Sequence, residues 1–176
     1  GVKEENERRR LINLEILSHQ RKSLFLVFVR FVKDQVHGNN KGEDSDGIVV
    51  RENSRDSVSE AFRIIRTNMD FMRVKAANLQ VVMFTSANPG AGKTFVSSNL
   101  AMSIAQTNKK VVLVDVDIRK GTLSGIFSNS SNRMGLTHYL SGSTDKLDDI
   151  IGRSEEYDKL DVIFSGPVPP NPAELL

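Results

Sequence analysis

The chain has 176 residues, enough for one hydrophobic core and an appendage, and no cysteine, which excludes disulfide bonds, thiolate metal sites and thiol catalysis. Its 24 basic and 22 acidic residues are interspersed and give a net charge of +2, so nothing points to nucleic acid as a partner. The longest apolar run, residues 24–32 with Arg30 inside it, is too short to span a bilayer.

Residues 1–47 differ from the rest and are interpreted as an N-terminal, mainly helical appendage followed by a linker. Residues 4–17 carry charges and apolar side chains at helical spacing, whereas residues 24–32 fit either a buried strand or one face of a helix. One interpretation of residues 1–35 is a membrane-proximal or partner-binding element. The other, which is favoured, is a helix that covers an edge of the core, or a remnant of a larger chain. Residues 37–47, rich in Gly, Asn and Asp, mark the boundary to a main domain at 48–176.

The spacing of apolar residues predicts a helix over 57–74, with Ser57 or Ser59 as its cap. The expected core stripe lies three and four residues apart, at Phe62, Ile65, Met69 and Met72. Beside the stripe, Glu60, Arg63 and Arg66 form a ladder at i, i+3 and i+6. The ladder is either a solvated face with an ion pair of about 0.2–0.5 kcal/mol or a contact between subunits, and the residues alone favour the first.

A strand–turn–helix pattern typical of a phosphate-binding P-loop follows. Residues 81–85 are apolar and β-branched, and residues 95–106 have helical spacing. The turn between them fits G-x-x-x-x-G-K-[ST], except that Ala87 replaces the first glycine and needs ordinary dihedral angles there. The backbone of the loop and the helix N-terminus would bind phosphate, Lys93 would reach the β- and γ-phosphates, and Thr94 would bind Mg²⁺. The alternative, a tight turn with a surface lysine, is disfavoured. The expected nucleotide-binding residues are Asn88, Pro89, Gly90, Ala91, Gly92, Lys93, Thr94 and Phe95.

The four apolar residues 111–114 predict a strand covered on both faces, and hence a parallel sheet. Asp115, Asp117 and Arg119 follow at its end. Ligands bind beyond the carboxyl ends of strands in open α/β sheets, so these carboxylates should lie beside the P-loop and hold Mg²⁺. The expected fold is therefore α/β, of the P-loop NTPase type, with a mostly parallel sheet flanked by helices.

The remaining segments add a second strand at 160–164 and a rigid, proline-rich connection at 165–172. Residues 147–151 read as a helical turn. His138 has no second histidine or cysteine near it in sequence, which favours a structural role. A helix begins at 173, and we expect more protein to follow it, so the domain is interpreted as incomplete at its C-terminal end.

Together, these motifs resemble the bacterial tyrosine kinases called BY-kinases, the P-loop autokinases of capsular and exopolysaccharide export. The resemblance covers about residues 50–176. Its carriers are Glu60-x-x-Arg63-x-x-Arg66, the loop 86–94 as Walker A, residues 112–119 as Walker A′, and Gly166 with residues 169–176.

The resemblance implies a protein-tyrosine kinase, a transferase that uses ATP and Mg²⁺ to phosphorylate tyrosine between subunits. It makes Lys93 a phosphate ligand, Thr94 and Asp117 metal ligands, and Asp115 a base or metal ligand; Arg119 joins the catalytic set. It makes the Glu60 ladder the oligomerisation element of a ring. It further implies a membrane activator segment in the same or a partner chain, a tyrosine-rich tail on a neighbouring subunit, and a place at the cytoplasmic face of the bacterial inner membrane.

Two other functions stay open. A ParA/MinD-type ATPase switch usually has a signature lysine near the start of the P-loop, where this chain has Asn88. A non-catalytic nucleotide-binding regulator of a polysaccharide-assembly complex would use ATP only to set its oligomeric state. No apolar run ending in aspartate follows Asp115, and the only tyrosines are Tyr139 and Tyr157, so the Walker B aspartate and the phosphorylated tyrosines are expected outside this sequence.

Overall fold

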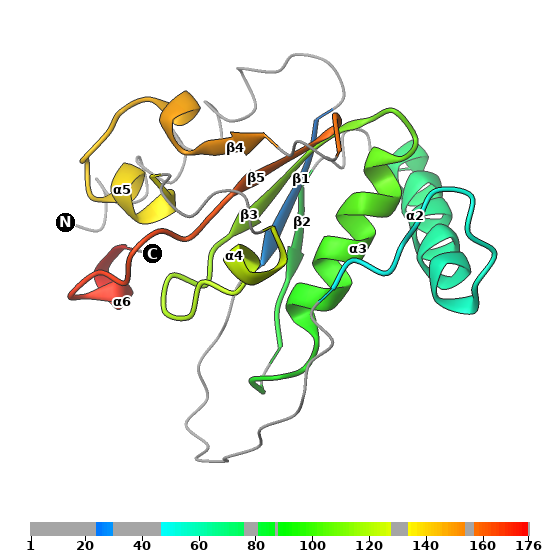
Figure 1. Ribbon diagram of the computed structural model, residues 1–176, viewed down its shortest axis with the longest axis horizontal. Helices are drawn as coiled ribbons and strands as arrows, with labels where there is room; N and C mark the ends of the chain where they lie inside the picture. The colour runs from blue at the N-terminus through cyan, green and yellow to red at the C-terminus, as the bar shows by residue number, and fades with distance from the viewer. Residues whose placement is uncertain are drawn as a thin grey trace.

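The computed structural model describes residues 24–29, 47–75, 81–86, 88–127, 134–153 and 157–175. Their centre is a five-stranded sheet with the order β2-β1-β3-β5-β4 (Figure 1). The strands β1, β2, β3 and β5 run parallel to one another, and β4 runs antiparallel, beside β5. The strands are β1 (Leu24–Val29), β2 (Val81–Phe84), β3 (Lys110–Asp115), β4 (Ile151–Arg153) and β5 (Leu160–Ile163). The predicted mostly parallel α/β sheet is confirmed.

The position of β1 differs from the prediction. Residues 24–32 were predicted to be a buried strand or one face of a helix, within an N-terminal appendage. Leu24–Val29 is a strand, but it lies inside the sheet, between β2 and β3. Its backbone pairs with β2 on one side and β3 on the other, so it completes two ladders that would otherwise be open edges. Residues 4–17 and 37–46, predicted as helix and linker, lie outside the described residues.

The register of β1 brings the ends of its neighbours to the same level. Val29 pairs with Phe84 on β2 and with Asp115 on β3. Because all three strands are parallel, the segments that follow β2 and β3 leave the sheet at the same edge. In Figure 1 the short helix α4 (Leu123–Ile126) lies near the centre, and the loop after β3 and the P-loop lie below it.

Helices cover both faces of the sheet. On one side α3 (Lys93–Ala105) lies against the strands, and α2 (Ser57–Lys75) packs on α3 (Figure 1). The other side carries α5 (Leu136–Leu140), the 3₁₀ helix η2 (Leu147–Asp149) and, further along the chain, α6 (Pro172–Leu175). Along β3, Val111 and Leu113 join the core on the α3 side, and Val112 and Val114 join the core on the α5 side. The strand is thus covered on both faces, as predicted.

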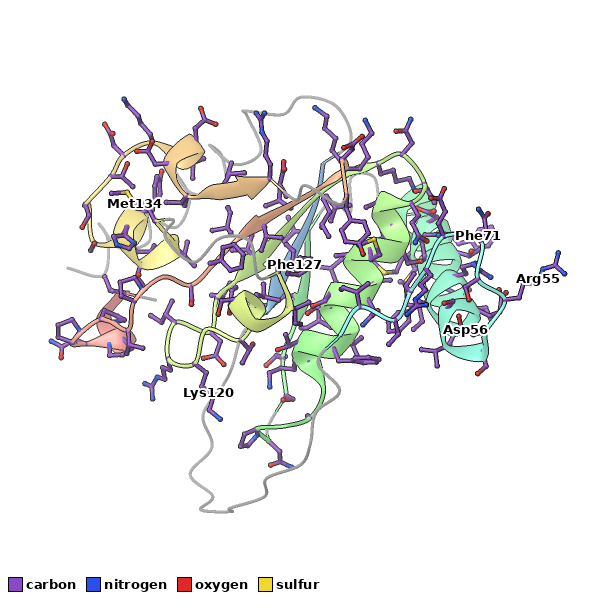
Figure 2. The ribbon with its side chains drawn as sticks, in the orientation of Figure 1. Arg55, Asp56, Phe71, Lys120, Phe127 and Met134 are labelled. Carbon is purple, nitrogen blue, oxygen red and sulfur yellow. The ribbon has the colours of Figure 1, made fainter. Side chains whose placement is uncertain are left out.

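Helix α2 has the predicted extent but a different cap and a different buried face. Asp56 is the cap, because its carboxylate accepts the backbone N–H groups of Val58 and Ser59 at 3.0 and 2.8 Å (Figure 2 shows Asp56 at the start of α2). Phe62 and Met69 are buried as expected. Ile65 and Met72 of the predicted stripe are instead 41% and 53% exposed, since among the described elements α2 packs mainly on α3 and buries a narrower face.

The segment before α2 runs along α3 without joining the sheet. Asn99, in the middle of α3, accepts the N–H groups of Val49 and Val50 and donates to the carbonyl of Gly47. Residues 48–50 are therefore held against α3 and are not part of the sheet. In the described ranges, no helix is both long enough and apolar enough to cross a bilayer.

Candidate nucleotide site

The P-loop backbone takes the predicted strand–loop–helix path. It leaves β2 after Phe84 and enters α3 at Lys93, with Gly92 as the N-cap. Gly90 and Gly92 have φ angles of +73° and +76°, which disfavour any residue with a Cβ atom. Ala87, at the position of the missing first glycine, lies outside the described residues. The exposed turn and the first N–H groups of α3 provide the donors that an anion needs.

Lys93 is held inside its own loop. Its Nζ donates to the hydroxyl of Ser86 at 2.8 Å, and that hydroxyl donates to the carbonyl oxygen of Asn88 at 2.8 Å. The ammonium is therefore oriented by a residue that the sequence analysis did not single out. A phosphate would compete with the Ser86 oxygen for the same protons.

The side chain of Phe95, at the end of the predicted binding loop, turns away from the site. Its ring packs edge to face against Phe62 of α2, with centroids 6.1 Å apart. Phe95 thus belongs to the core between α2 and α3, and only its backbone is available to a nucleotide.

Thr94 contacts a residue that lies 28 positions further along the chain. Its hydroxyl is 2.9 Å from the hydroxyl of Thr122, which directly precedes α4. This pair joins the first turn of α3 to the loop that follows β3. No local pattern in the sequence signals it, because a single threonine after a glycine is common in turns.

Asp115 organises the loop after β3. It is completely buried, and its two oxygens accept the backbone N–H groups of Asp117 and Leu123 at 3.0 and 3.1 Å. Burial raises the pKa of Asp115 to about 6, with a smaller contribution from the nearby charge of Asp117, although the two backbone hydrogen bonds oppose the shift. Asp115 therefore holds the loop in place. Each of its oxygens accepts one N–H group and keeps a lone pair, so its role as base or metal ligand stays a prediction.

Asp117 and Arg119 lie further along the same loop, Asp117 buried and Arg119 exposed. The Oδ1 atom of Asp117 accepts the N–H groups of Arg119 and Lys120 at 3.4 and 3.3 Å, which closes the turn. Arg119 and Lys120 are exposed, and Figure 2 shows Lys120 projecting outward from this loop. The structure therefore brings Lys93, Thr94, Asp117 and the buried Asp115 to one edge of the sheet.

The donor set suits Mg²⁺ bound together with phosphate. In the described part of the chain, no group of three or more His, Cys, Asp or Glu side chains could hold a metal by itself. Mg²⁺ keeps several waters and is usually bound by one or two protein oxygens plus phosphate oxygens. The Thr94 hydroxyl and the Asp117 carboxylate are hard oxygen donors of this type.

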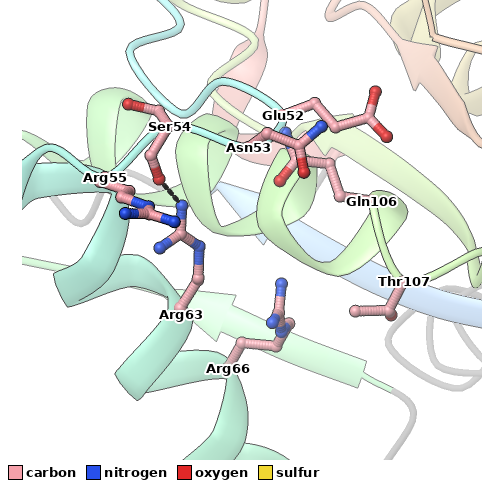
Figure 3. Close-up of a pocket in the computed structure, with 8 residues that line it drawn as sticks. All are labelled: Glu52, Asn53, Ser54, Arg55, Arg63, Arg66, Gln106 and Thr107. Carbon is pink, nitrogen blue, oxygen red and sulfur yellow. Dashed lines mark hydrogen bonds between the residues drawn. The ribbon is translucent and has the colours of Figure 1, made fainter.

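The Glu60 ladder lies beside a pocket of about 450 Å³ between α2, the loop before it and the end of α3 (Figure 3). Arg63 pairs with Glu60 and donates to the carbonyl of Ser54, and Arg66 donates to the carbonyl of Ser103 on α3 at 2.6 Å. The ion pair within the helix that was expected for a solvated ladder is thus present, between Glu60 and Arg63. Both arginines also tie α2 to its own chain. The pocket is lined by Glu52, Asn53, Ser54, Arg55, Arg63, Arg66, Gln106 and Thr107.

His138 has the structural role predicted for it. Its Nδ1 atom accepts the N–H of Gly135 at 3.0 Å and so fixes the start of α5. Leu136 and Thr137 in turn donate their N–H groups to the carbonyl oxygens of Phe164 and Ser165, directly after β5, at 2.7 and 2.9 Å.

Comparison with known proteins gives a consistent set of relatives. Residues 79–167 match the family described as AAA domain. The tyrosine-protein kinase Etk of Escherichia coli K12 is 44% identical over 127 residues, which are 71% of this chain and 17% of Etk. The tyrosine-protein kinase YwqD of Bacillus subtilis strain 168 is 45% identical over 118 residues, 67% of this chain and 48% of YwqD. The solved kinase domain of E. coli ETK superposes with a TM-score of 0.64 at 43% identity, over 71% of this chain and 48% of that domain. The chain therefore spans half or less of the length of these relatives.

Proposed function

Because the chain belongs to the bacterial tyrosine kinase family, with an AAA domain over residues 79–167, we propose that it supplies the P-loop of an ATP- and Mg²⁺-dependent tyrosine autokinase. The reaction moves the γ-phosphoryl group of ATP to a tyrosine hydroxyl and regulates capsular or exopolysaccharide export. The observation that carries the proposal is the meeting of two segments at one sheet edge. The P-loop with Lys93 and the loop with Asp117 are joined there by the contact between Thr94 and Thr122.

Each side chain has a defined task in this proposal. The N–H groups of the P-loop and of the α3 N-terminus bind the phosphates, and Lys93 leaves Ser86 to neutralise the β- and γ-phosphates. Thr94 and Asp117 hold Mg²⁺, which when bound supplies charge neutralisation on the phosphate oxygens. The exposed guanidinium of Arg119 adds a positive charge near the transferred group. Asp115 keeps the loop in shape.

The same proposal places the protein in an assembly. The Glu60 ladder would contact the next subunit of a ring at the cytoplasmic face of the bacterial inner membrane. Arg63 and Arg66 already bind carbonyls of their own chain, but a guanidinium has five N–H donors, so each retains donors for a carboxylate on a neighbour. A membrane activator segment and a tyrosine-rich tail of the neighbouring subunit complete the proposed set of partners.

Transfer of label from ATP tests the function. The chain is incubated with γ-labelled ATP, Mg²⁺ and a glutamate–tyrosine copolymer as acceptor, with Lys93→Met as control. Label in phosphotyrosine that is lost in the control supports the kinase. Release of labelled phosphate alone would instead identify an ATPase switch, and neither product would identify a non-catalytic regulator.

A further inference from the structure

Two hydroxyl groups from distant parts of the chain meet at the mouth of the P-loop. The Oγ1 atoms of Thr94 and Thr122 are 2.9 Å apart, which is hydrogen-bonding distance, and either atom can be the donor. Thr94 is the P-loop residue proposed to bind Mg²⁺. Thr122 is exposed and has no part in the core.

The position of Thr122 is fixed by the loop that carries it. The next residue, Leu123, is completely buried, and its N–H is bound by the buried carboxylate of Asp115. The preceding residue, Gly121, donates its N–H to the carbonyl of Asp117 at 2.9 Å. Thr122 is thus held from both sides by the aspartates of the β3 loop, and its hydroxyl is presented to Thr94.

A hydroxyl group has one proton and two lone pairs. When the Thr94 oxygen gives a lone pair to a cation, its proton needs an acceptor on the side away from the cation. The Thr122 oxygen already lies within hydrogen-bonding distance of that group. Groups that orient a metal ligand in this way commonly contribute about 10- to 100-fold to metal affinity.

We infer that Thr122 is a positioning residue, which orients the Thr94 hydroxyl for Mg²⁺ and so couples the β3 loop to the metal in the nucleotide complex. The inference rests on the proposed function, because it assumes that Thr94 binds Mg²⁺ beside a nucleotide. Thr122 itself need not touch the metal or the nucleotide.

The test measures binding rather than turnover. The affinity for a fluorescent ADP analogue is measured in excess EDTA and then as a function of Mg²⁺ concentration. Thr122→Val removes the hydroxyl but keeps the shape, and Thr122→Ser restores the hydroxyl. Ser124→Ala is the matched control. It removes an exposed hydroxyl from the same loop, one that donates to the carbonyl of Gly121.

We expect Thr122→Val to raise the Mg²⁺ concentration needed for half-maximal tightening by about tenfold, while the affinity in EDTA changes less than about twofold. Thr122→Ser and Ser124→Ala should behave like the wild type. In a Thr94→Val background, Thr122→Val should have no further effect, because the partner through which it acts is gone.

Wild-type dependence on Mg²⁺ in Thr122→Val would overturn the role of Thr122 and leave the proposed function intact. An equal loss of affinity in EDTA and in Mg²⁺, or an additive loss in the Thr94→Val background, would also overturn it. Absence of nucleotide binding by the wild type in both conditions would overturn the proposed function and this role with it.

Discussion

The carboxylate of Asp115, at the end of β3, accepts the N–H of Leu123, at the start of α4, at a distance of 3.1 Å. This bond closes the loop between the two residues and sets the position of Thr122 beside the P-loop. A completely buried aspartate thus determines the geometry of a loop that exposes Arg119, Lys120 and Thr122 to solvent. The cost of burying the ionised carboxylate of Asp115 should be visible in the dependence of stability on pH.

Stability of the ligand-free chain should fall as the pH rises from about 4 to about 6. Burial raises the pKa of Asp115 from 3.8 to about 6, so in this range the folded chain keeps a proton that the unfolded chain has lost. Because the folded state binds more protons there, the free energy of unfolding decreases with pH, by about 3 kcal/mol from this group, and becomes level above about pH 6. Urea denaturation at several pH values measures it.

Asp115→Asn isolates this effect from Asp161, whose pKa is also raised by burial. The asparagine cannot titrate, so the difference in stability between variant and wild type should change across pH 4–6 and then stay constant. Parallel curves for the two proteins would show that Asp115 titrates normally in the folded chain.

Gly135→Ala should lower the free energy of unfolding by about 3 kcal/mol. The backbone of Gly135 is extended, at φ −125°, so the conformation itself allows any residue. A Cβ atom would however lie 2.4 Å from the backbone nitrogen of Gly166 and 2.7 Å from the carbonyl oxygen of Phe164, and would force α5 away from the end of β5.

Gly125→Ala is the matched control for that substitution, because a Cβ atom there meets nothing within 4 Å. It should leave the stability unchanged or raise it slightly, since alanine favours the helical conformation of α4. Equal denaturation midpoints for the two variants would mean that α5 and the end of β5 do not approach as closely as described.

Asn99→Ala should release the segment before α2 from α3. The amide of Asn99 is completely buried and is the acceptor for the N–H groups of Val49 and Val50, which would lose their partner at a cost of about 3 kcal/mol. Hydrogen exchange followed by NMR should show faster exchange of these two amides. Ser98→Ala, which removes only a bond to the carbonyl of Thr94, should leave both protected. Unchanged protection in Asn99→Ala would be inconsistent with the clamp.

Replacing both Arg63 and Arg66 by alanine should shift the protein toward the monomer in light scattering. It should also lower the melting temperature, because Arg66 binds the carbonyl of Ser103 on α3. Arg55→Ala is the control, since Arg55 lines the same pocket but is not part of the ladder. If the double variant melts earlier and keeps the wild-type mass, the ladder acts only within its own chain.

The sequence predicted the parts of the fold whose signals are local. The P-loop, the strand before Asp115 and the helix of residues 57–75 each have a pattern complete within a short stretch, and all were found with nearly the expected bounds. Asp56 was missed as the helix cap because Ser57 and Ser59 are equally good caps by residue type. The exposure of Ile65 depends on which helix α2 packs against, which its own periodicity does not specify.

The remaining errors concern contacts between distant residues. An apolar run such as residues 24–29 is compatible with many places in a sheet, and its pairing with both β2 and β3 is set by tertiary structure. Ser86, Asn99 and Thr122 are ordinary polar residues by sequence. Their roles depend on the residues that the fold brings to them. Ser86 binds Lys93, Asn99 binds Val49, and Thr122 contacts Thr94.

A calorimetric titration of the chain with Mg²⁺ and a non-hydrolysable ATP analogue, alongside Lys93→Met, tests the phosphate site most directly. One nucleotide should bind per wild-type chain. The variant should give no binding heat, and its far-UV circular dichroism and melting temperature should match the wild type because Lys93 lies outside the core. Equal affinity in the two proteins would contradict the assignment of the phosphate site to this loop.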